Sequence, residues 1–276
     1  MFEKIYIELS DICGLDCVFC PSKKGKRGVM SLGNFETVAK KVHKRARIFT
    51  FHILGDPLLL KDLESYMLIA KQYSMKLEIT SSGFYLDSSK TKLLQKSDII
   101  RQVNFSLASF FSQKRLSFLE YFTPLLEFLR YDFKKKFINL RLWNLDKNFN
   151  PPDENTLFYE ALENEFDIKI DKNKKLNKLK DYVVLHQKSL FDWSFSKIKR
   201  DKGTCYGLSK QLGILSDGTV IPCCMDYDGV ISLGNIFYDD LDLILQSKRV
   251  QDIKDGFRNG ILLEDICKRC DFARKS

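Results

Sequence analysis

The chain has 276 residues and a formal net charge of +9, and 44% of its residues are hydrophobic. This composition is typical of a globular protein and excludes a disordered chain, and no run of about eighteen apolar residues, as a membrane helix requires, occurs. The length suits one large domain, or one large and one small domain, with a sizeable core.

The excess of basic over acidic residues has two interpretations, a solvated surface or a nucleic-acid partner. No RNA-binding signature accompanies it. The first residues, MFEKIYIELS, include Glu3 and Glu8 and lack the apolar stretch of a signal peptide, so a cytoplasmic protein is expected. The eight cysteines are therefore not expected to form disulfides.

Strand-like and helix-like segments alternate over residues 1–172, which we expect to form the first domain. The expected strands are Lys4–Leu9, Arg47–Leu54, Met75–Ser81, Arg101–Leu107 and Lys136–Trp143. The expected helices are Ser31–Lys44 (with Ser31 as the N-cap), Leu58–Tyr73, Ser88–Lys96, Gln113–Leu129 and one that begins within Asn150–Glu154. Strict alternation predicts an α/β fold with a parallel sheet, either open and doubly wound or a complete or partial barrel. In both, ligands bind beyond the carboxyl ends of the strands.

The alternation weakens over residues 173–204, which we expect to be a linker and the end of the barrel. A second domain that contains cysteines is expected over residues 205–276. Within it, Gln211–Cys224 predicts a β-hairpin with its turn at Ser216-Asp217-Gly218, and Tyr238–Gly256 predicts a helix.

The segment CGLDCVFC directly follows the first expected strand and contains Cys13, Cys17 and Cys20. A zinc site closed by protein normally has four ligands, so three thiolates favour a metal centre with one open position. Iron–sulfur clusters are also held by cysteine thiolates. On the residues alone, a zinc site completed by His43 or His52 is an alternative.

This segment resembles the signature of the radical S-adenosylmethionine (SAM) superfamily, in which three cysteines are separated by three and two residues and an aromatic residue, here Phe19, precedes the last. The resemblance implies a partial (β/α)6 TIM-type barrel. It implies that Cys13, Cys17 and Cys20 hold a catalytic [4Fe-4S] cluster whose fourth iron binds SAM. It also implies reductive cleavage of SAM to a 5′-deoxyadenosyl radical that abstracts hydrogen, and an electron donor such as flavodoxin or ferredoxin.

The same resemblance implies SAM-binding residues after the other strands. Gly55, Asp56 and Pro57 in LGDP occupy the place of Gly-Gly-Glu-Pro in the family, and Asp56 keeps an anionic acceptor for the SAM amino group. Ser82 in TSSG replaces the asparagine of the family, and Ser106 in FSLAS matches its serine.

Three residues deeper in the expected barrel receive weaker interpretations. Ala108 stands where the family usually has Asp, which weakens a ribose contact there. Arg141 on the fifth strand is a candidate ligand for a carboxylate, because the planar guanidinium binds carboxylates in a bidentate manner. His52 is interpreted as a structural histidine of a strand.

Cys205, Cys223, Cys267 and Cys270 resemble the ligand pattern of the C-terminal auxiliary-cluster domains called SPASM and Twitch. The resemblance implies that these four thiolates hold a second [4Fe-4S] cluster, as in the shorter, single-cluster Twitch form. Cys224 is left over, either as a buried small residue or as a replacement for Cys223. A structural zinc site with four cysteines is the alternative.

The sequence therefore predicts a radical SAM enzyme that oxidises or otherwise modifies a peptide or a small molecule. One alternative is a non-enzymatic iron–sulfur or zinc protein that regulates by contacting nucleic acid. The other is a radical SAM enzyme that modifies RNA. No membrane partner is expected.

Overall fold

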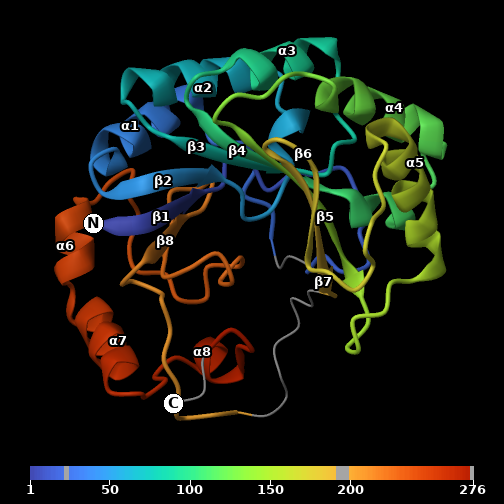
Figure 1. Cartoon of the computed structure of the whole chain (residues 1–276). Coiled ribbons are helices and arrows are strands. Elements are labelled where there is room, and N and C mark those ends of the chain that lie inside the picture. The colour runs from blue at the N-terminus through green and yellow to red at the C-terminus, as the bar shows by residue number, and fades with distance from the viewer. Residues whose placement is uncertain (22–24, 191–198, 274–276) are drawn as a thin grey trace.

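A computed structural model describes residues 1–21, 25–190 and 199–273 of the chain (Figure 1). Six strands run parallel in chain order: β1 (Phe2–Ile7), β2 (Ala46–Phe51), β3 (Leu77–Ser81), β4 (Ile100–Ser106), β5 (Phe137–Leu145) and β7 (Val183–Ser189). The same sheet includes β6 (Leu176–Lys180), β8 (Gln211–Ile214) and β9 (Val220–Ile221), in the order β6-β7-β5-β4-β3-β2-β1-β8-β9. The antiparallel strands β6 and β9 lie at its two edges, so the sheet is open. The expected α/β partial barrel is confirmed.

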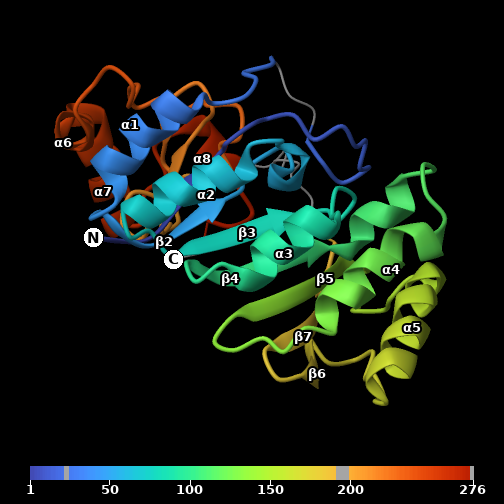
Figure 2. The same ribbon diagram turned by 90° about the horizontal axis from the view of Figure 1, so that it is seen from above.

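Helices cover the outer face of this curved sheet (Figure 2). They are α1 (Leu32–Val42), α2 (Leu63–Gln72), α3 (Ser88–Lys96), α4 (Phe118–Leu129) and α5 (Thr156–Phe166), with short 3-10 turns η1 (Pro57–Leu59), η2 (Leu107–Ser112) and η3 (Asp153–Asn155). The C-terminal region contains α6 (Leu241–Gln246), α7 (Lys248–Arg258) and α8 (Asp265–Arg269). The Ser31 hydroxyl accepts a hydrogen bond from the Asn34 N–H at 3.1 Å, so the expected N-cap of α1 is confirmed.

The two faces of the sheet differ in polarity because successive side chains of a strand point to opposite sides. Residues such as Ile5, Phe49 and Ile79 are almost fully buried in the core shared with the helices. Burying each such side chain stabilises the fold by about 1.5–3 kcal/mol. Their neighbours Tyr6 and Thr80 face a cavity on the inner side. Parallel strands that are covered on both faces usually have continuous apolar sequences, so this polar inner face indicates a binding site.

Four expected helices have different boundaries. The helix expected over Leu58–Tyr73 begins at Leu63, after the separate turn η1, and the helix expected to begin within Asn150–Glu154 begins at Thr156, after η3. The helix expected over Gln113–Leu129 begins at Phe118, because Ser117 and Glu120 form a capping box that starts it there. The helix expected over Tyr238–Gly256 is divided into α6 and α7 by Ser247, whose hydroxyl caps the start of α7.

The C-terminal region continues the sheet of the barrel. Strand β8 lies parallel to β1, with Gln211 opposite Lys4, and β9 pairs antiparallel with β8. The expected hairpin is present, and its turn requires Gly218, which has φ +85° and no space for a Cβ beside the Phe237 ring, 2.7 Å away. The second region is therefore joined to the first by backbone hydrogen bonds.

Residues 173–204, expected to be a linker and the end of the barrel, contain the hairpin β6–β7, and β7 is the last parallel strand of the barrel. Residues 191–198 lie outside the described part of the chain. Among the described residues, no helix combines the length and the apolar character needed to cross a membrane.

A buried ion pair joins three segments near the end of β1. The fully buried Glu8 carboxylate accepts two hydrogen bonds from the Arg27 guanidinium, each of 2.9 Å, and one from the Ser216 N–H at 3.1 Å. The Asp11 carboxylate accepts from the N–H groups of Arg27 and Gly28 at 2.9 and 3.0 Å. These bonds fix the end of the cysteine-containing loop and the β8–β9 turn to the same strand.

The substitution Glu8→Gln is expected to lower the free energy of unfolding by about 3 kcal/mol, because it leaves a buried guanidinium without its carboxylate. Chemical denaturation measures this change. The control is Asp98→Asn, which removes an exposed ion pair with Lys71 and is expected to leave the unfolding midpoint unchanged. Equal midpoints for all three proteins would contradict the structural role of Glu8.

Candidate functional site

A cavity of about 370 Å³ lies on the inner face of the sheet, between the barrel strands and the C-terminal region. Side chains from seven strands, from the cysteine loop after β1 and from the C-terminal region line it: Lys4, Tyr6, Phe19, Thr50, His52, Glu78, Thr80, Asn104, Ser106, Ala108, Arg141, Trp143, Lys188, Gln211, Cys224, Met225 and Phe272. The predicted site residues Phe19, Ser106 and Arg141 therefore share one cavity. Ser106 and Arg141 are also register partners on β4 and β5.

The loop that contains the first three cysteines is fastened to other elements at several points. The Tyr85 hydroxyl donates to the Cys13 carbonyl at 2.6 Å, and the Val18 N–H donates to the Ser112 hydroxyl at 3.3 Å. The Gln113 side-chain amide donates to the Cys17 sulfur at 3.7 Å. These contacts hold the loop against the end of η2, so its conformation does not depend on the loop alone.

The three thiols lie close enough to influence one another. Burial, the neighbouring thiols and the Asp56 carboxylate raise the pKa of Cys13 to about 12. Burial and the Cys20 thiol raise the pKa of Cys17 to about 12. Thiols with such values stay protonated at neutral pH unless a positive centre stabilises their thiolates, and a bound metal does so.

The loop after β2 approaches the cysteine loop closely at Gly55. This residue has φ +70°, and a Cβ there would lie 2.1 Å from the Ser10 carbonyl oxygen, so only glycine fits. The loop after β2 therefore makes a close approach to the backbone of this chain itself. The following Asp56 N–H donates to the Ile12 carbonyl at 3.3 Å, and Pro57 begins η1.

The Asp56 carboxylate is buried and is not among the groups that line the cavity. It accepts hydrogen bonds from the Leu58 N–H at 3.0 Å, the Ser81 hydroxyl at 3.0 Å, the Ser82 N–H at 2.8 Å and the Ser82 hydroxyl. Burial raises its pKa, while the Ser82 and Ser81 hydrogen bonds oppose that rise. Asp56 thus ties the loop after β2 to the end of β3, and Ser82 faces Asp56.

Arg141 is a half-buried cation, and the nearby Glu78 carboxylate, which pairs with Lys4 and Arg101, favours its charged form. Its guanidinium lies 4.5 Å from the Trp143 ring centre, and none of the ion pairs within the described ranges includes it. Burial lowers its pKa to about 10, so it remains charged at neutral pH. The buried Arg141 Nε, Trp143 Nε1 and Thr50 Oγ1 have no hydrogen-bond partner in the described part of the chain. Orphaned buried donors that face a cavity indicate a ligand with acceptor atoms.

His52 lies in the same cavity and is uncharged. Burial and the nearby cations Arg141 and Lys4 lower its pKa to about 3. His43 is not among the residues that line this cavity. It is the C-cap of α1, and its Nδ1 contacts the Lys40 carbonyl at 3.0 Å. Within residues 1–21, 25–190 and 199–273, no three His, Cys, Asp or Glu side chains are gathered closely enough to hold a single metal ion. A cluster differs from a single ion because each of its irons takes a different thiolate.

The second set of cysteines comes from three segments of the C-terminal region. Burial raises the pKa of Cys223, Cys267 and Cys270, and the Cys205 thiol raises them further, so these four thiols lie near one another. The fifth cysteine, Cys224, also raises the pKa of Cys223, and it differs from the other four in its place beside the barrel. It lines the cavity, where its thiol interacts with the Tyr6 hydroxyl.

Several residues of the site were not identified from the sequence. Tyr85, Gln113 and Tyr6 hold cysteine segments that are distant from them along the chain, and no short motif includes both partners. For Tyr6, the sequence feature that could have indicated a role in the site is its position on β1, directly before the cysteine motif.

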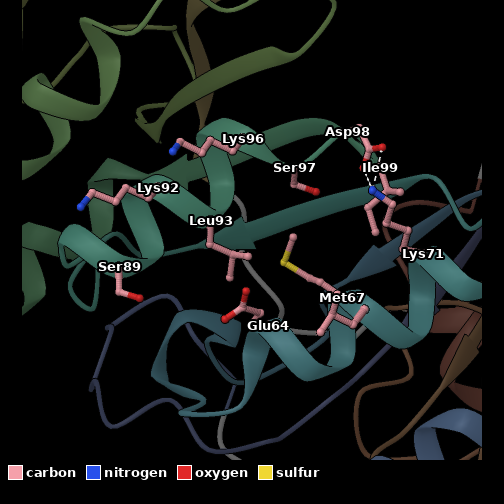
Figure 3. Close-up of a pocket in the computed structure, with 11 residues that line it drawn as sticks. Glu64, Met67, Lys71, Ser89, Lys92, Leu93, Lys96, Ser97, Asp98 and Ile99 are labelled. Carbon is pink, nitrogen blue, oxygen red and sulfur yellow. Dashed lines mark hydrogen bonds and ion pairs between the residues drawn. The ribbon is translucent and has the colours of Figure 1, made fainter.

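A larger cavity of about 520 Å³ lies outside the barrel, between α2 and α3 (Figure 3). Its wall includes the ion pair between Lys71 and Asp98, at 2.9 Å, and the apolar Met67 and Leu93. It contains none of the predicted site residues, so size alone does not identify the functional cavity.

Comparisons with known proteins agree with this geometry. The model of the radical SAM superfamily matches residues 7–136, and that of SPASM, an iron–sulfur cluster-binding domain, matches residues 205–271. The crystal structure of BtrN in complex with AdoMet and 2-DOIA is similar, with 16% identity and a TM-score of 0.59 over 98% of this chain and 93% of that one. Streptococcus suis SuiB bound to the precursor peptide SuiA has 15% identity and a TM-score of 0.62 over 97% and 71%.

A third similar structure is anSMEcpe with bound AdoMet, with 17% identity and a TM-score of 0.58 over 98% of this chain and 84% of that one. At such identities the likeness establishes the fold. No curated protein matches the chain significantly.

The pKa of His52 makes the stability of the protein depend on pH. Its value of about 3 in the folded state lies below that of an unfolded chain, about 6.5, so the unfolded state binds more protons as the pH falls. Stability is therefore lost on acidification through the unfolded value. From about pH 7.5 to about pH 5.5, His52 is expected to contribute a loss of about 1.4 kcal/mol.

Chemical denaturation at both pH values measures this loss. The variant His52→Gln should lose less stability than the wild-type protein by that amount. Identical pH profiles for the two proteins would show that His52 is not buried as a neutral group.

Proposed function

This chain belongs to the radical SAM superfamily, and we propose that it is an enzyme that uses SAM to remove hydrogen from a peptide or small-molecule substrate. Its cofactors are SAM and two iron–sulfur clusters. The observation that carries the proposal is the cavity that places the first cysteine loop, the C-terminal region and Arg141, whose Nε has no hydrogen-bond partner among the described residues, around one space.

The residues at both cysteine sites fit such clusters. Cys13, Cys17 and Cys20 offer three mutually interacting thiols, and the Gln113 amide donates to one of the sulfurs. We assign these three to a [4Fe-4S] cluster with one iron left for SAM. When bound, this cluster supplies the electron that cleaves the sulfonium of SAM into methionine and a 5′-deoxyadenosyl radical, which abstracts hydrogen.

The residues of this chain would bind and orient SAM. Arg141 would receive the SAM carboxylate, since its Nε has no hydrogen-bond partner among the described residues and the Trp143 ring holds the guanidinium plane in position. Ser106, the register partner of Arg141, would add a hydroxyl contact, and Phe19 would form an apolar wall next to the cluster. The Arg141 Nε is buried, and a charge-assisted hydrogen bond to a buried donor is stronger than one in water.

The loop after β2 and the end of β3 would contribute backbone groups to the SAM site. The residues concerned are Gly55, Asp56, Pro57 and Ser82. The donors that bond to the Asp56 carboxylate are groups of this chain, so the carboxylate positions the loop between β2 and α2. In the family this motif accepts the SAM amino group. We assign that role here to the backbone groups around Gly55, with Asp56 as the positioning residue.

The C-terminal region would close the cavity and provide the second cluster site. Met225 and Phe272 line the cavity from that region and exclude water from it. Cys205, Cys223, Cys267 and Cys270 would hold the auxiliary [4Fe-4S] cluster, which all four thiolates close. An external carrier such as flavodoxin or ferredoxin would supply electrons.

The substrate class rests on the proteins of similar fold. SuiB is bound to a precursor peptide, and BtrN is bound to 2-DOIA, so a peptide or a small molecule is proposed here. Oxidation or another modification of that substrate is the proposed outcome.

Metal analysis after anaerobic reconstitution tests the cluster assignment. We expect about eight irons per chain, and about four in either Cys13→Ala or Cys267→Ala, since each variant loses one cluster. With SAM and a reductant, the wild-type protein should form 5′-deoxyadenosine and Cys13→Ala should not. Zinc in place of iron, or equal 5′-deoxyadenosine from both proteins, would contradict the proposal.

Arg141→Gln tests the carboxylate contact. Because it removes a charge-assisted hydrogen bond worth about 1.5–3 kcal/mol, SAM should bind about 10- to 150-fold more weakly. The matched ligand is decarboxylated SAM, which should bind equally to the variant and to the wild-type protein. If both ligands lose the same affinity, Arg141 does not bind the carboxylate.

A further inference from the structure

Cys224 is the one cysteine that neither set uses, and it lies in the cavity. Its neighbour Cys223, whose thiol lies near those of Cys224, Cys205 and Cys267, is not among the cavity residues. The Cys224 thiol instead interacts with the Tyr6 hydroxyl of β1. Of the two adjacent cysteines, only Cys224 lines the cavity.

The contacts of Cys224 belong to both regions of the chain. It packs against an apolar cluster of Ile53, Leu54, Leu215 and Ile221, which come from the loop after β2 and from the β8–β9 hairpin. Tyr6 packs on the same cluster. A cysteine packed in this way behaves as a small apolar residue with a weak S–H group.

A separate observation indicates that this cavity binds a ligand. The Arg141 Nε, the Trp143 Nε1 and the Thr50 hydroxyl are buried beside it, and within the described residues none has a hydrogen-bond partner. Phe19, which precedes Cys20 in the first cysteine loop, lines the same space. The thiol therefore faces the compartment in which, under the proposed function, substrate and SAM meet.

We propose that Cys224 is a catalytic hydrogen-atom donor to a carbon radical formed in this cavity, with Tyr6 as the residue that positions its thiol. This inference rests on the proposed function. It makes Cys224 a reactant and excludes it from the ligands of the auxiliary cluster.

The step balances as follows. The Cys224 S–H bond breaks, its hydrogen atom forms a C–H bond at the substrate radical, and a sulfur-centred radical is left on Cys224. One electron from the flavodoxin- or ferredoxin-type carrier and one proton from solvent restore the thiol. The substrate thereby loses one hydrogen to 5′-deoxyadenosine and gains one from the thiol, so its oxidation state does not change, while SAM is consumed and two electrons are used in total.

The test needs no identified substrate, because SAM alone is the probe. Reconstituted protein is given SAM and dithionite in D₂O, where thiol hydrogens exchange for deuterium, and the 5′-deoxyadenosine formed is analysed by mass spectrometry. A thiol that faces the cavity donates deuterium to the radical generated there. We expect singly deuterated 5′-deoxyadenosine from the wild-type protein and a loss of most of this label in Cys224→Ser, which keeps the size but not the weak S–H bond.

Metal content provides a readout that is independent of turnover. Cys224→Ser and Cys224→Ala should retain about eight irons per chain, whereas Cys223→Ala should retain about four. Tyr6→Phe should also keep its iron and should lower the deuterium label without abolishing it, as expected for a positioning residue.

The outcomes separate this inference from the proposed function. If the wild-type protein forms no 5′-deoxyadenosine above the Cys13→Ala control, the proposed function fails. If 5′-deoxyadenosine forms but its label is absent or is the same in Cys224→Ser, the hydrogen-donor role is overturned. Loss of about four irons in Cys224→Ala would make Cys224 a cluster ligand and would also overturn it.

Discussion

The pairing of β8 with β1 determines where the chemistry of this protein can occur. These strands lie side by side in one sheet although they are far apart in the sequence, and the first cysteine loop follows one of them while the second cysteine set flanks the other. The Glu8–Arg27 pair and its bond to Ser216 then fix the loop and the hairpin turn to the same strand end. Figure 1 shows the C-terminal region, in orange and red, beside the early strands. Backbone hydrogen bonds set this arrangement, and in it Phe19 and Cys224, which are next to Cys20 and Cys223 in the sequence, line one cavity.

Polar groups on the inner face of the sheet lower the stability of the fold but favour the binding of a ligand. The Arg141 Nε and the Trp143 indole N–H are buried with no hydrogen-bond partner among the described residues, and such groups cost about 1–3 kcal/mol each. The apolar residues on the opposite face, beneath the helices, compensate for that cost. A bound SAM carboxylate would satisfy the guanidinium, so the same groups that destabilise the empty fold would favour binding. This is the physical reason why a parallel strand such as β5 carries alternating polar residues.

The sequence allowed most of the architecture to be predicted and only part of the site. The order of strands and helices, the hairpin turn at Gly218 and the clustering of cysteines are local patterns, and the structure has them. The inward turn of Asp56 toward Ser82 could not be predicted, because it depends on how two neighbouring strands end. The pairs Glu8–Ser216 and Tyr6–Cys224 join residues about 200 positions apart, and only the completed sheet brings them together.

The central claim is that Cys13, Cys17 and Cys20 leave one position of a bound cluster free for SAM. Electron paramagnetic resonance of the reduced, reconstituted protein measures this directly, because a ligand that binds to an iron changes the spectrum of its cluster. We expect SAM to change the spectrum of one cluster in the wild-type protein and in Cys267→Ala, and to change nothing in Cys13→Ala. A spectrum that is the same with and without SAM in the wild-type protein would contradict the account.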